Sequence, residues 1–376
     1  MPSVADCFRQ HAPAYFQQHG ANVPLGHRKV ITAITRCRTG EIGHVRFACE
    51  GCGREHWVGR SCGNRHCPNC GHAKSLRWLE KQTKRLLPVH HFLVTFTVPS
   101  ELRMVLRGAQ RDGYGGMFDA GSETIRDLGA SSRYLKGCTL GFFGVLHTWG
   151  RDPTVYHPHI HFVVPGGGVN VTEGVWQQTP ENFLFAHAAA VKVYKGKLAE
   201  RLRKVGLYDR IDSRVWTKSF TVDIKPVGNG QAVLKYLAPY VHRVAISDKR
   251  IVNCDAKTVK YRFTPTGKRQ SVTRTVAGTE FLRGIMQHTL PSGFQKVRYY
   301  GWMSQNSRVS LDEVRWLVWL YLGWIFYLAT RCRVEPELPS PTFRCDHCGG
   351  NLRANLVIDH VGRVLYEHAP PYLDSG

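Results

Sequence analysis

Two extended segments with histidines at matching positions constrain the fold of this chain most strongly. Residues 142–149 alternate like a strand, residues 150–153 supply turn formers, and an apolar run containing His159, Ile160 and His161 follows. Because successive side chains of a strand point to opposite faces, the two histidines lie side by side while Ile160 points into the core. The pattern predicts an antiparallel hairpin that presents two imidazoles on one face.

The register of this hairpin predicts a metal site. A turn centred near Asp152 to Thr154 places His147 opposite His159, and directly opposed residues have Cβ atoms about 5 Å apart. His147 would then complete a site of three imidazoles, which are the commonest protein metal ligands. His157 shares the parity of His159 and His161 and is the alternative third ligand. The other interpretation is a strand whose histidines line a solvated edge.

The cysteines predict structural zinc. Cys49 and Cys52 form one CxxC pair, Cys67 and Cys70 form another, and 14 residues separate the pairs. This spacing is typical of four thiolates around one zinc ion at about 2.3 Å. With no secretory signal at the start of the chain, the thiolates indicate a reducing compartment, and we expect a cytoplasmic protein. Further candidates, as a second site or as ordinary side chains, are Cys37, His44, Cys62 and His66.

The C-terminal part holds a proline-rich linker at residues 334–342 and then a lone CxxC pair, Cys345 and Cys348. Cys332 and His360 are the candidates for completing a zinc site there. The apolar run at residues 316–330 is 15 residues long, shorter than the roughly 20 that span a bilayer. It predicts a buried C-terminal helix and no membrane insertion.

The charge points to a polyanionic partner. The chain has 51 Lys and Arg against 28 Asp and Glu, a net charge of +23, which favours nucleic acid over a membrane surface. Basic side chains accompany the zinc-binding cysteines, as expected of a DNA-binding module. They are Arg54, Arg60, Arg65, Lys74, Arg77, Lys81, Lys84 and Arg85.

The remaining patterns indicate an α+β fold. Helical spacing covers residues 1–35, 100–136 and 183–204, with a glycine-rich interruption expected at residues 113–116. Strand composition covers residues 86–99 and 219–225. Both kinds of element therefore surround the histidine hairpin.

Two tyrosines follow in a segment with helical spacing. Tyr236 and Tyr240 are four residues apart, so on a helix both phenols share one face. Pro239 cannot donate to the carbonyl of Lys235, and we expect the helix to kink or end there. The alternative interpretation is a pair of aromatic side chains that only pack on a helix face.

Together these motifs resemble a known family. The HPHIHF segment followed by VVPGGG, the later Tyr-x3-Tyr and the N-terminal SCGNRHCPNC occur in the order found in two-tyrosine HUH transposases of bacterial insertion sequences. HUH denotes two histidines around a bulky hydrophobe. The likeness covers roughly residues 10–305 and is closest to the insertion-sequence-91 family.

The resemblance implies a fold and an activity. The fold would be an HUH-endonuclease-like antiparallel sheet flanked by helices, preceded by a small zinc-binding domain. Mg²⁺ or Mn²⁺ on the histidines, with Tyr236 or Tyr240 as nucleophile, would nick and rejoin single-stranded or locally melted DNA through a 5′-phosphotyrosine, as in rolling-circle transposition. The expected domains are residues 1–88 for DNA binding, 89–310 for catalysis and 311–376 for the C-terminal helix, linker and CxxC pair.

Two other functions fit part of the pattern. A zinc-dependent phosphodiester hydrolase would use the three histidines with water as nucleophile, and it would not need the tyrosines. A non-enzymatic zinc DNA-binding protein would account for the charge and the cysteines, but it leaves the histidine and tyrosine motifs without a use.

Overall fold

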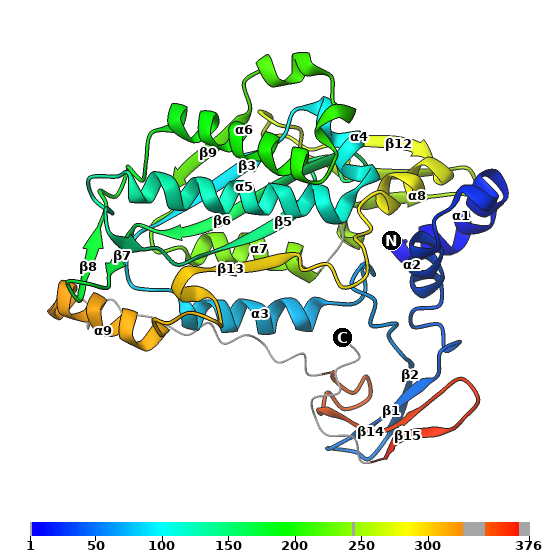
Figure 1. The fold of residues 1–376 in the computed structure, drawn as a ribbon. Helices are drawn as coiled ribbons and strands as arrows, with labels where there is room; N and C mark the ends of the chain where they lie inside the picture. The colour runs from blue at the N-terminus through cyan, green and yellow to red at the C-terminus, as the bar shows by residue number, and fades with distance from the viewer. Residues whose placement is uncertain (1, 243–244, 326–342, 368–376) are drawn as a thin grey trace.

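The computed structural model describes residues 2–242, 245–325 and 343–367, and one antiparallel sheet forms its centre (Figure 1). Five strands follow the order β13-β5-β6-β3-β9, which puts the histidine-bearing strand β6 in the middle. Their bounds are β3 His91–Thr97, β5 Phe142–Trp149, β6 Tyr156–Pro165, β9 Thr221–Pro226 and β13 Val297–Tyr300. Helices combined with antiparallel sheets confirm the predicted α+β class.

Each face of the central sheet is covered by helices. Helices α5 and α6 lie on one face, and α3 and α7 lie on the other (Figure 1). Alternation along β6 divides the core between them, because Ile160 is buried with the side chains of α5 and α6 while Val163 is buried with those of α7. The bounds of the four helices are α3 His72–Arg85, α5 Gln110–Ala130, α6 His187–Lys204 and α7 Gln231–His242.

The predicted glycine interruption at residues 113–116 is wrong. Helix α5 runs through these residues, and the break from α4 (Ser100–Gly108) falls at Ala109. The glycines permit close packing instead: a Cβ atom on Gly113 would lie 2.8 Å from the Leu106 side chain. Tertiary packing here outweighs the low helix propensity of glycine.

The N-terminal helices form as predicted and pack beside the central sheet. Helix α1 (Val4–His19) begins with a capping box, in which the Ser3 hydroxyl accepts from the Asp6 backbone N–H at 3.1 Å. Together with α2 (Leu25–Thr35) it shares a core with α8 (Gly278–Met286) and a sheet of order β10-β11-β12. The strands of that sheet are β10 Ile251–Cys254, β11 Thr258–Phe263 and β12 Val272–Ala277.

Shorter elements complete the fold. A small sheet has the order β4-β7-β8, with β4 Cys138–Thr139, β7 Gly167–Asn170 and β8 Val175–Gln178. Short 3-10 helices are η1 Gly20–Asn22, η2 Tyr208–Arg210, η3 Ser213–Thr217, η4 Asp248–Arg250 and η5 Gly301–Met303.

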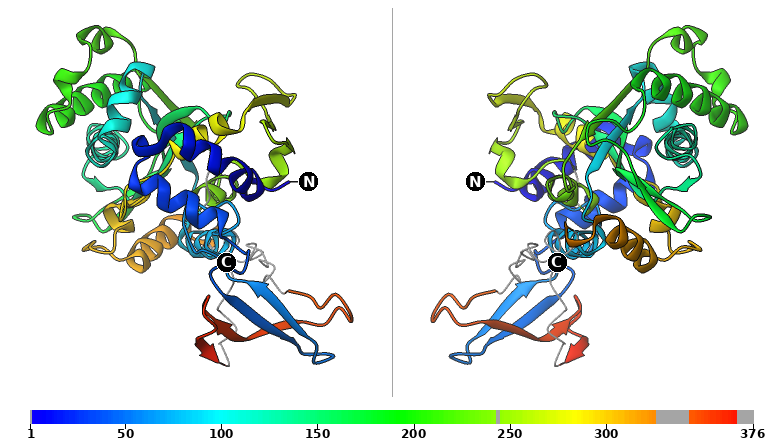
Figure 2. Two further views of the ribbon diagram at one scale, coloured as in Figure 1. Left: turned by 90° about the vertical axis from the view of Figure 1, so that its right-hand side faces the viewer. Right: turned by 90° about the vertical axis from the view of Figure 1, so that its left-hand side faces the viewer.

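A four-stranded sheet projects from the rest of the molecule (Figure 2). Its order is β15-β14-β1-β2, so strands from near both ends of the chain lie side by side. We call residues 44–59 and 343–367, which contain this sheet, the split lobe. Its strands are β1 His44–Cys49, β2 Glu55–Gly59, β14 Leu352–Ile358 and β15 Val364–Glu367.

The apolar run near the C-terminus forms a helix that is mostly exposed. In α9 (Leu311–Leu322) only Val314 and Val318 are buried, whereas the Trp316 side chain is 58% exposed. The prediction of a buried helix is therefore wrong for its described part, because a single i, i+4 stripe meets the core.

Residues 326–342, with the expected linker and Cys332, lie outside the described residues. Within the described residues, no helix has the length and apolarity needed to cross a membrane.

Candidate functional site

Strands β5 and β6 bring three histidines together. The Cα register pairs His147 with His159, which confirms the predicted hairpin alignment. Potential ligand nitrogens of His147, His159 and His161 lie within 4.8 Å of one another, and all three side chains are buried. His157 is outside this group, although its ring centroid lies 5.2 Å from that of His159.

Hydrogen bonds at Nδ1 fix the orientation of two of these imidazoles. His159 Nδ1 lies 2.8 Å from the backbone carbonyl oxygen of His157, and His161 Nδ1 lies 2.8 Å from the Thr95 hydroxyl oxygen. When Nδ1 carries the proton in both contacts, Nε2 keeps its lone pair for a ligand. The buried Nε2 atoms of His147 and His161 have no hydrogen-bond partner among the described residues. Imidazoles held in this way suit a divalent cation. A histidine that binds a metal ion through one ring nitrogen commonly donates a hydrogen bond from the N–H of the other nitrogen to a neighbouring acceptor.

The electrostatics keep the histidines neutral. Burial, reinforced by neighbouring His161, holds the pKa of His147 and that of His159 well below the ordinary value. Burial, with a smaller effect of Lys225, lowers the pKa of His161 to about 4. Neutral imidazole is the form that binds metal ions, so no proton has to be displaced near neutral pH.

Helix α7 presents both tyrosines to the histidines. The ring centroid of Tyr236 lies 6.1 Å from that of His161, and the ring centroid of Tyr240 lies 4.8 Å from that of His147. The two phenol rings are 5.3 Å apart, as expected for an i, i+4 pair. Tyr236 is 49% exposed, whereas Tyr240 is half-buried.

The helix does not end at Pro239, one of the two predicted effects of this residue, because α7 continues to His242. Pro239 removes one amide donor, but Val233, Leu234 and Leu237 are buried and anchor the same helix against the sheet. Both tyrosines therefore remain on one continuous helix.

A cavity of about 570 Å³ unites these residues. Tyr236, Tyr240 and the histidines line it together with two cationic side chains, Arg151 and Arg250. Two carboxylates, Asp152 and Asp223, are also present. The cavity combines nitrogens that could bind a metal ion, two phenols and positive charge, a combination that could bind and attack a phosphodiester.

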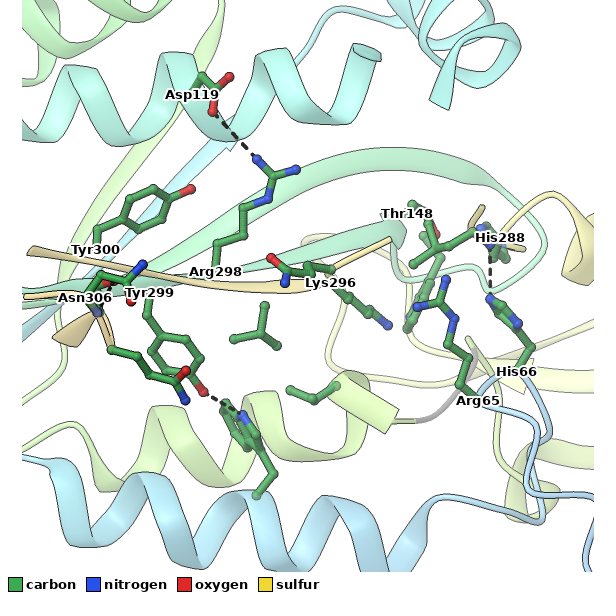
Figure 3. Close-up of a pocket in the computed structure, with 18 residues that line it drawn as sticks. Arg65, His66, Asp119, Thr148, His288, Lys296, Arg298, Tyr299, Tyr300 and Asn306 are labelled. Carbon is green, nitrogen blue, oxygen red and sulfur yellow. Dashed lines mark hydrogen bonds and ion pairs between the residues drawn. The ribbon is translucent and has the colours of Figure 1, made fainter. Parts of the chain in front are cut away.

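A second cavity, of about 690 Å³, lies beside edge strand β13 (Figure 3). Trp149 lines both cavities, and the Lys296 ammonium sits 4.7 Å from the centre of its ring. The same ammonium donates a hydrogen bond to the backbone carbonyl of Tyr240. Burial lowers the pKa of Lys296 to about 7. Lys296 therefore caps the last turn of α7, from the side of the second cavity.

The two CxxC pairs predicted to share one zinc are separated in the structure. Cys49 lies at the tip of the β1–β2 hairpin, whereas Cys67 is buried with the N-terminal helices, so the four thiols cannot meet. Described cysteines instead form two groups of four, each with sulfurs within 4.8 Å: Cys37, Cys62, Cys67 and Cys70, and Cys49, Cys52, Cys345 and Cys348.

The first group has the spacing of a zinc site. Cys70 Sγ lies 3.6 Å from Cys37 Sγ and 3.7 Å from Cys62 Sγ. A tetrahedron with Zn–S bonds of about 2.3 Å places its sulfurs about 3.8 Å apart. Cys37 and Cys62, candidates for a second site by sequence, thus complete the site of Cys67 and Cys70.

The remaining candidate ligands lie elsewhere. His66 Nε2 accepts a hydrogen bond from the Leu290 backbone N–H at 3.0 Å, and the His44 ring packs edge-on against Trp57. Neither residue belongs to a cysteine group, and neither does His360.

Sequence reasoning missed Thr95 and Lys296. Thr95 lies opposite His161 on β3, but this pairing joins residues 66 apart in the chain, so no local pattern marks it. Lys296 carries no local signal, since its contact with the Tyr240 carbonyl depends on how β13 docks against α7.

Comparisons with known proteins identify the family of the chain. Residues 141–310 match a family model described as putative transposase, and residues 7–98 match a transposase zinc-binding domain. The putative transposase y4qJ of Sinorhizobium fredii is 34% identical over 328 residues, 82% of this chain and 81% of that protein. The transposase for insertion sequence element IS801 of Pseudomonas savastanoi pv. phaseolicola is 23% identical over 74% of this chain and 70% of that protein. Among solved structures, none matches the chain significantly.

The cysteine groups and the matched zinc-binding domain together support structural zinc in the N-terminal region. The chain belongs to the IS91 family of transposases with an N-terminal zinc-binding domain.

Proposed function

We propose that this transposase nicks and rejoins single-stranded DNA through a covalent 5′-phosphotyrosine formed by Tyr236 or Tyr240. The observation that carries the proposal is the meeting of two tyrosines and three neutral histidines in one cavity. Transposases act on DNA, and the net charge of +23 suits that substrate.

His147, His159 and His161 would hold a divalent cation, Mg²⁺ or Mn²⁺. When bound, such a cation polarises the non-bridging oxygens of the scissile phosphate and makes its phosphorus more electrophilic. Arg151 and Arg250 line the same cavity and attract the phosphodiester. These residues bind and orient the substrate, whereas helix α7 supplies the attacking group.

The chemical step conserves the number of phosphoester bonds. A phenol oxygen of Tyr236 or Tyr240 forms a bond to phosphorus while the bond from phosphorus to the 3′-oxygen breaks. The phenol loses its proton, and the departing 3′-oxygen gains one and becomes a hydroxyl. Because the phosphotyrosine keeps the energy of the cleaved linkage, a 3′-hydroxyl can later reverse the step and rejoin DNA.

The nucleophile needs help to ionise. Burial, reinforced by neighbouring Tyr240, raises the pKa of Tyr236, while Arg151 acts in the opposite direction. Positive charge near the phenol oxygen, from Arg151 and from a bound cation, would favour the phenolate during attack.

A nicking assay with histidine variants tests the proposal. The probes are labelled single-stranded oligonucleotides that tile the DNA on both sides of the coding sequence, each with a matched duplex, in Mn²⁺ or Mg²⁺. We expect nicking of single strands only, lost in His161→Ala and His147→Ala but retained in His157→Ala, whose imidazole is outside the group of three. Equal cleavage of duplexes, or full activity of His161→Ala, would contradict the proposal.

A further inference from the structure

The second cysteine group joins residues from opposite ends of the chain. Cys49 Sγ lies 3.4 Å from Cys348 Sγ, and Cys52 Sγ lies 3.8 Å from Cys345 Sγ. A disulfide would require about 2.05 Å, whereas a tetrahedral zinc thiolate site places sulfurs about 3.8 Å apart. These separations therefore fit four thiolates that share one metal ion.

The two CxxC turns have the same backbone structure. Gly53 N–H donates to the Cys49 carbonyl and Gly349 N–H donates to the Cys345 carbonyl, both at 2.9 Å. Both glycines have positive φ, 69° for Gly53 and 71° for Gly349, which suits glycine at such tight turns. Two turns of this kind facing each other form the ligand arrangement of a zinc ribbon.

The two CxxC turns lie very close to each other. Gly350 N–H lies 3.4 Å from Cys348 Sγ as a hydrogen-bond donor, and a Cβ atom on Gly350 would lie 3.0 Å from Cys49 Sγ. Backbone amides aimed at sulfur stabilise the thiolate form that binds metal. Glycine at position 350 thus permits the C-terminal turn to reach the N-terminal thiols.

The apolar core of the split lobe is small. Its buried apolar cluster consists of Val45, Phe47, Ala354 and Val357. A core of this size falls far short of what a domain needs to fold by itself, and small domains of this kind depend on a metal or a disulfide. The described cysteines are free thiols, so a metal is the available cross-link.

We propose that Cys49, Cys52, Cys345 and Cys348 bind a second structural zinc ion that fastens the C-terminal segment to the N-terminal zinc-binding domain. Four thiolates close the coordination sphere, which makes the site structural rather than catalytic. The matched zinc-binding domain ends at residue 98 and does not include the C-terminal pair. This inference does not depend on the nicking reaction.

Zinc stoichiometry of the intact protein tests the proposal. Native mass spectrometry should give two zinc ions per chain for the unaltered protein and one for Cys345→Ser/Cys348→Ser. Cys49→Ser/Cys52→Ser should show the same loss, because both pairs serve one ion. Cys138→Ser, whose thiol belongs to neither group, is the matched control and should retain two.

The same experiment separates this grouping from the one that the sequence alone suggests. If Cys49 and Cys52 shared an ion with Cys67 and Cys70, changing the C-terminal pair would leave the zinc count unaltered, and that result would overturn the proposal. Limited proteolysis gives a second readout that does not require the variants to bind DNA. Loss of the second zinc should expose a cleavage site that releases the C-terminal segment from an otherwise folded protein, and uncleaved C-terminal residues in the zinc-depleted variant would also overturn it.

Discussion

At the scale of single residues, the histidine site follows from parity and register. His159 and His161 share a face because they are two apart, and the turn at Asp152 aligns His147 with them. Local rules of strand geometry were therefore sufficient to predict these three positions. Thr95 could not be predicted in the same way, because its strand joins β6 from a distant part of the chain.

Thr95 provides the first prediction. Its hydroxyl holds His161 Nδ1 at 2.8 Å, so Thr95→Val should free the imidazole to rotate. We expect Mn²⁺ affinity, measured by isothermal titration calorimetry, to fall about 10- to 100-fold, as for other partners of metal-binding histidines. Thr97→Val is the control, because Thr97 lines the same cavity and is paired with His159, but its hydroxyl has no bond to an imidazole in the described chain. Equal effects of both changes would argue against an orienting role for Thr95.

At the scale of secondary-structure elements, the sequence predicted most helices and strands but not all of their ends. Apolar periodicity located α1, α2 and α6, and the spacing of the two tyrosines indicated α7, while the glycines of α5 and Pro239 of α7 do not end their helices as expected. Both exceptions have one cause, since burial of one face stabilises a helix more than a single unfavourable residue destabilises it.

Packing of the central sheet leads to a prediction about stability. A Cβ atom on Gly144 of β5 would lie 2.6 Å from the Phe162 ring, so Gly144→Ala should lower the free energy of unfolding by about 1–3 kcal/mol. A Cβ atom on Gly196, on the exposed face of α6, would have no described atom within 4 Å. There the same change should raise stability by up to about 1 kcal/mol. Denaturant unfolding checks both, and no difference between the two variants would contradict the described packing.

The stability of the last turn of α7 depends on Lys296. Lys296→Met removes the donor to the Tyr240 carbonyl, and loss of one such bond costs about 1 kcal/mol. Amide hydrogen exchange in the last turn of α7 should accelerate about fivefold, as measured by mass spectrometry. Lys235→Met, an exposed lysine on the same helix, should leave the exchange rates unchanged. Unaltered exchange in the Lys296 variant would show that the cap is dispensable.

At the scale of the whole molecule, the sequence predicted the classes of site but not how the ends of the chain meet. The spacing between Cys52 and Cys67 suggested a local zinc site, whereas the structure places Cys52 beside Cys345, which is 293 residues away. Sequence spacing describes local turns well and carries no information about contacts across such a separation. The pairing of β1 with β14 is what brings these cysteines together.

The proposed reaction begins with the attack of a tyrosine of this site on DNA. The most direct measurement is to trap the protein on a nicked single-stranded oligonucleotide, digest it and locate the DNA-linked peptide by mass spectrometry. We predict attachment at Tyr236 or Tyr240 and at least about a thousandfold less adduct in Tyr236→Phe/Tyr240→Phe. Tyr321→Phe, a change at an exposed tyrosine of α9, should leave the yield unaltered. Nicking that persists in the double variant without any covalent adduct would contradict the account and identify water as the nucleophile.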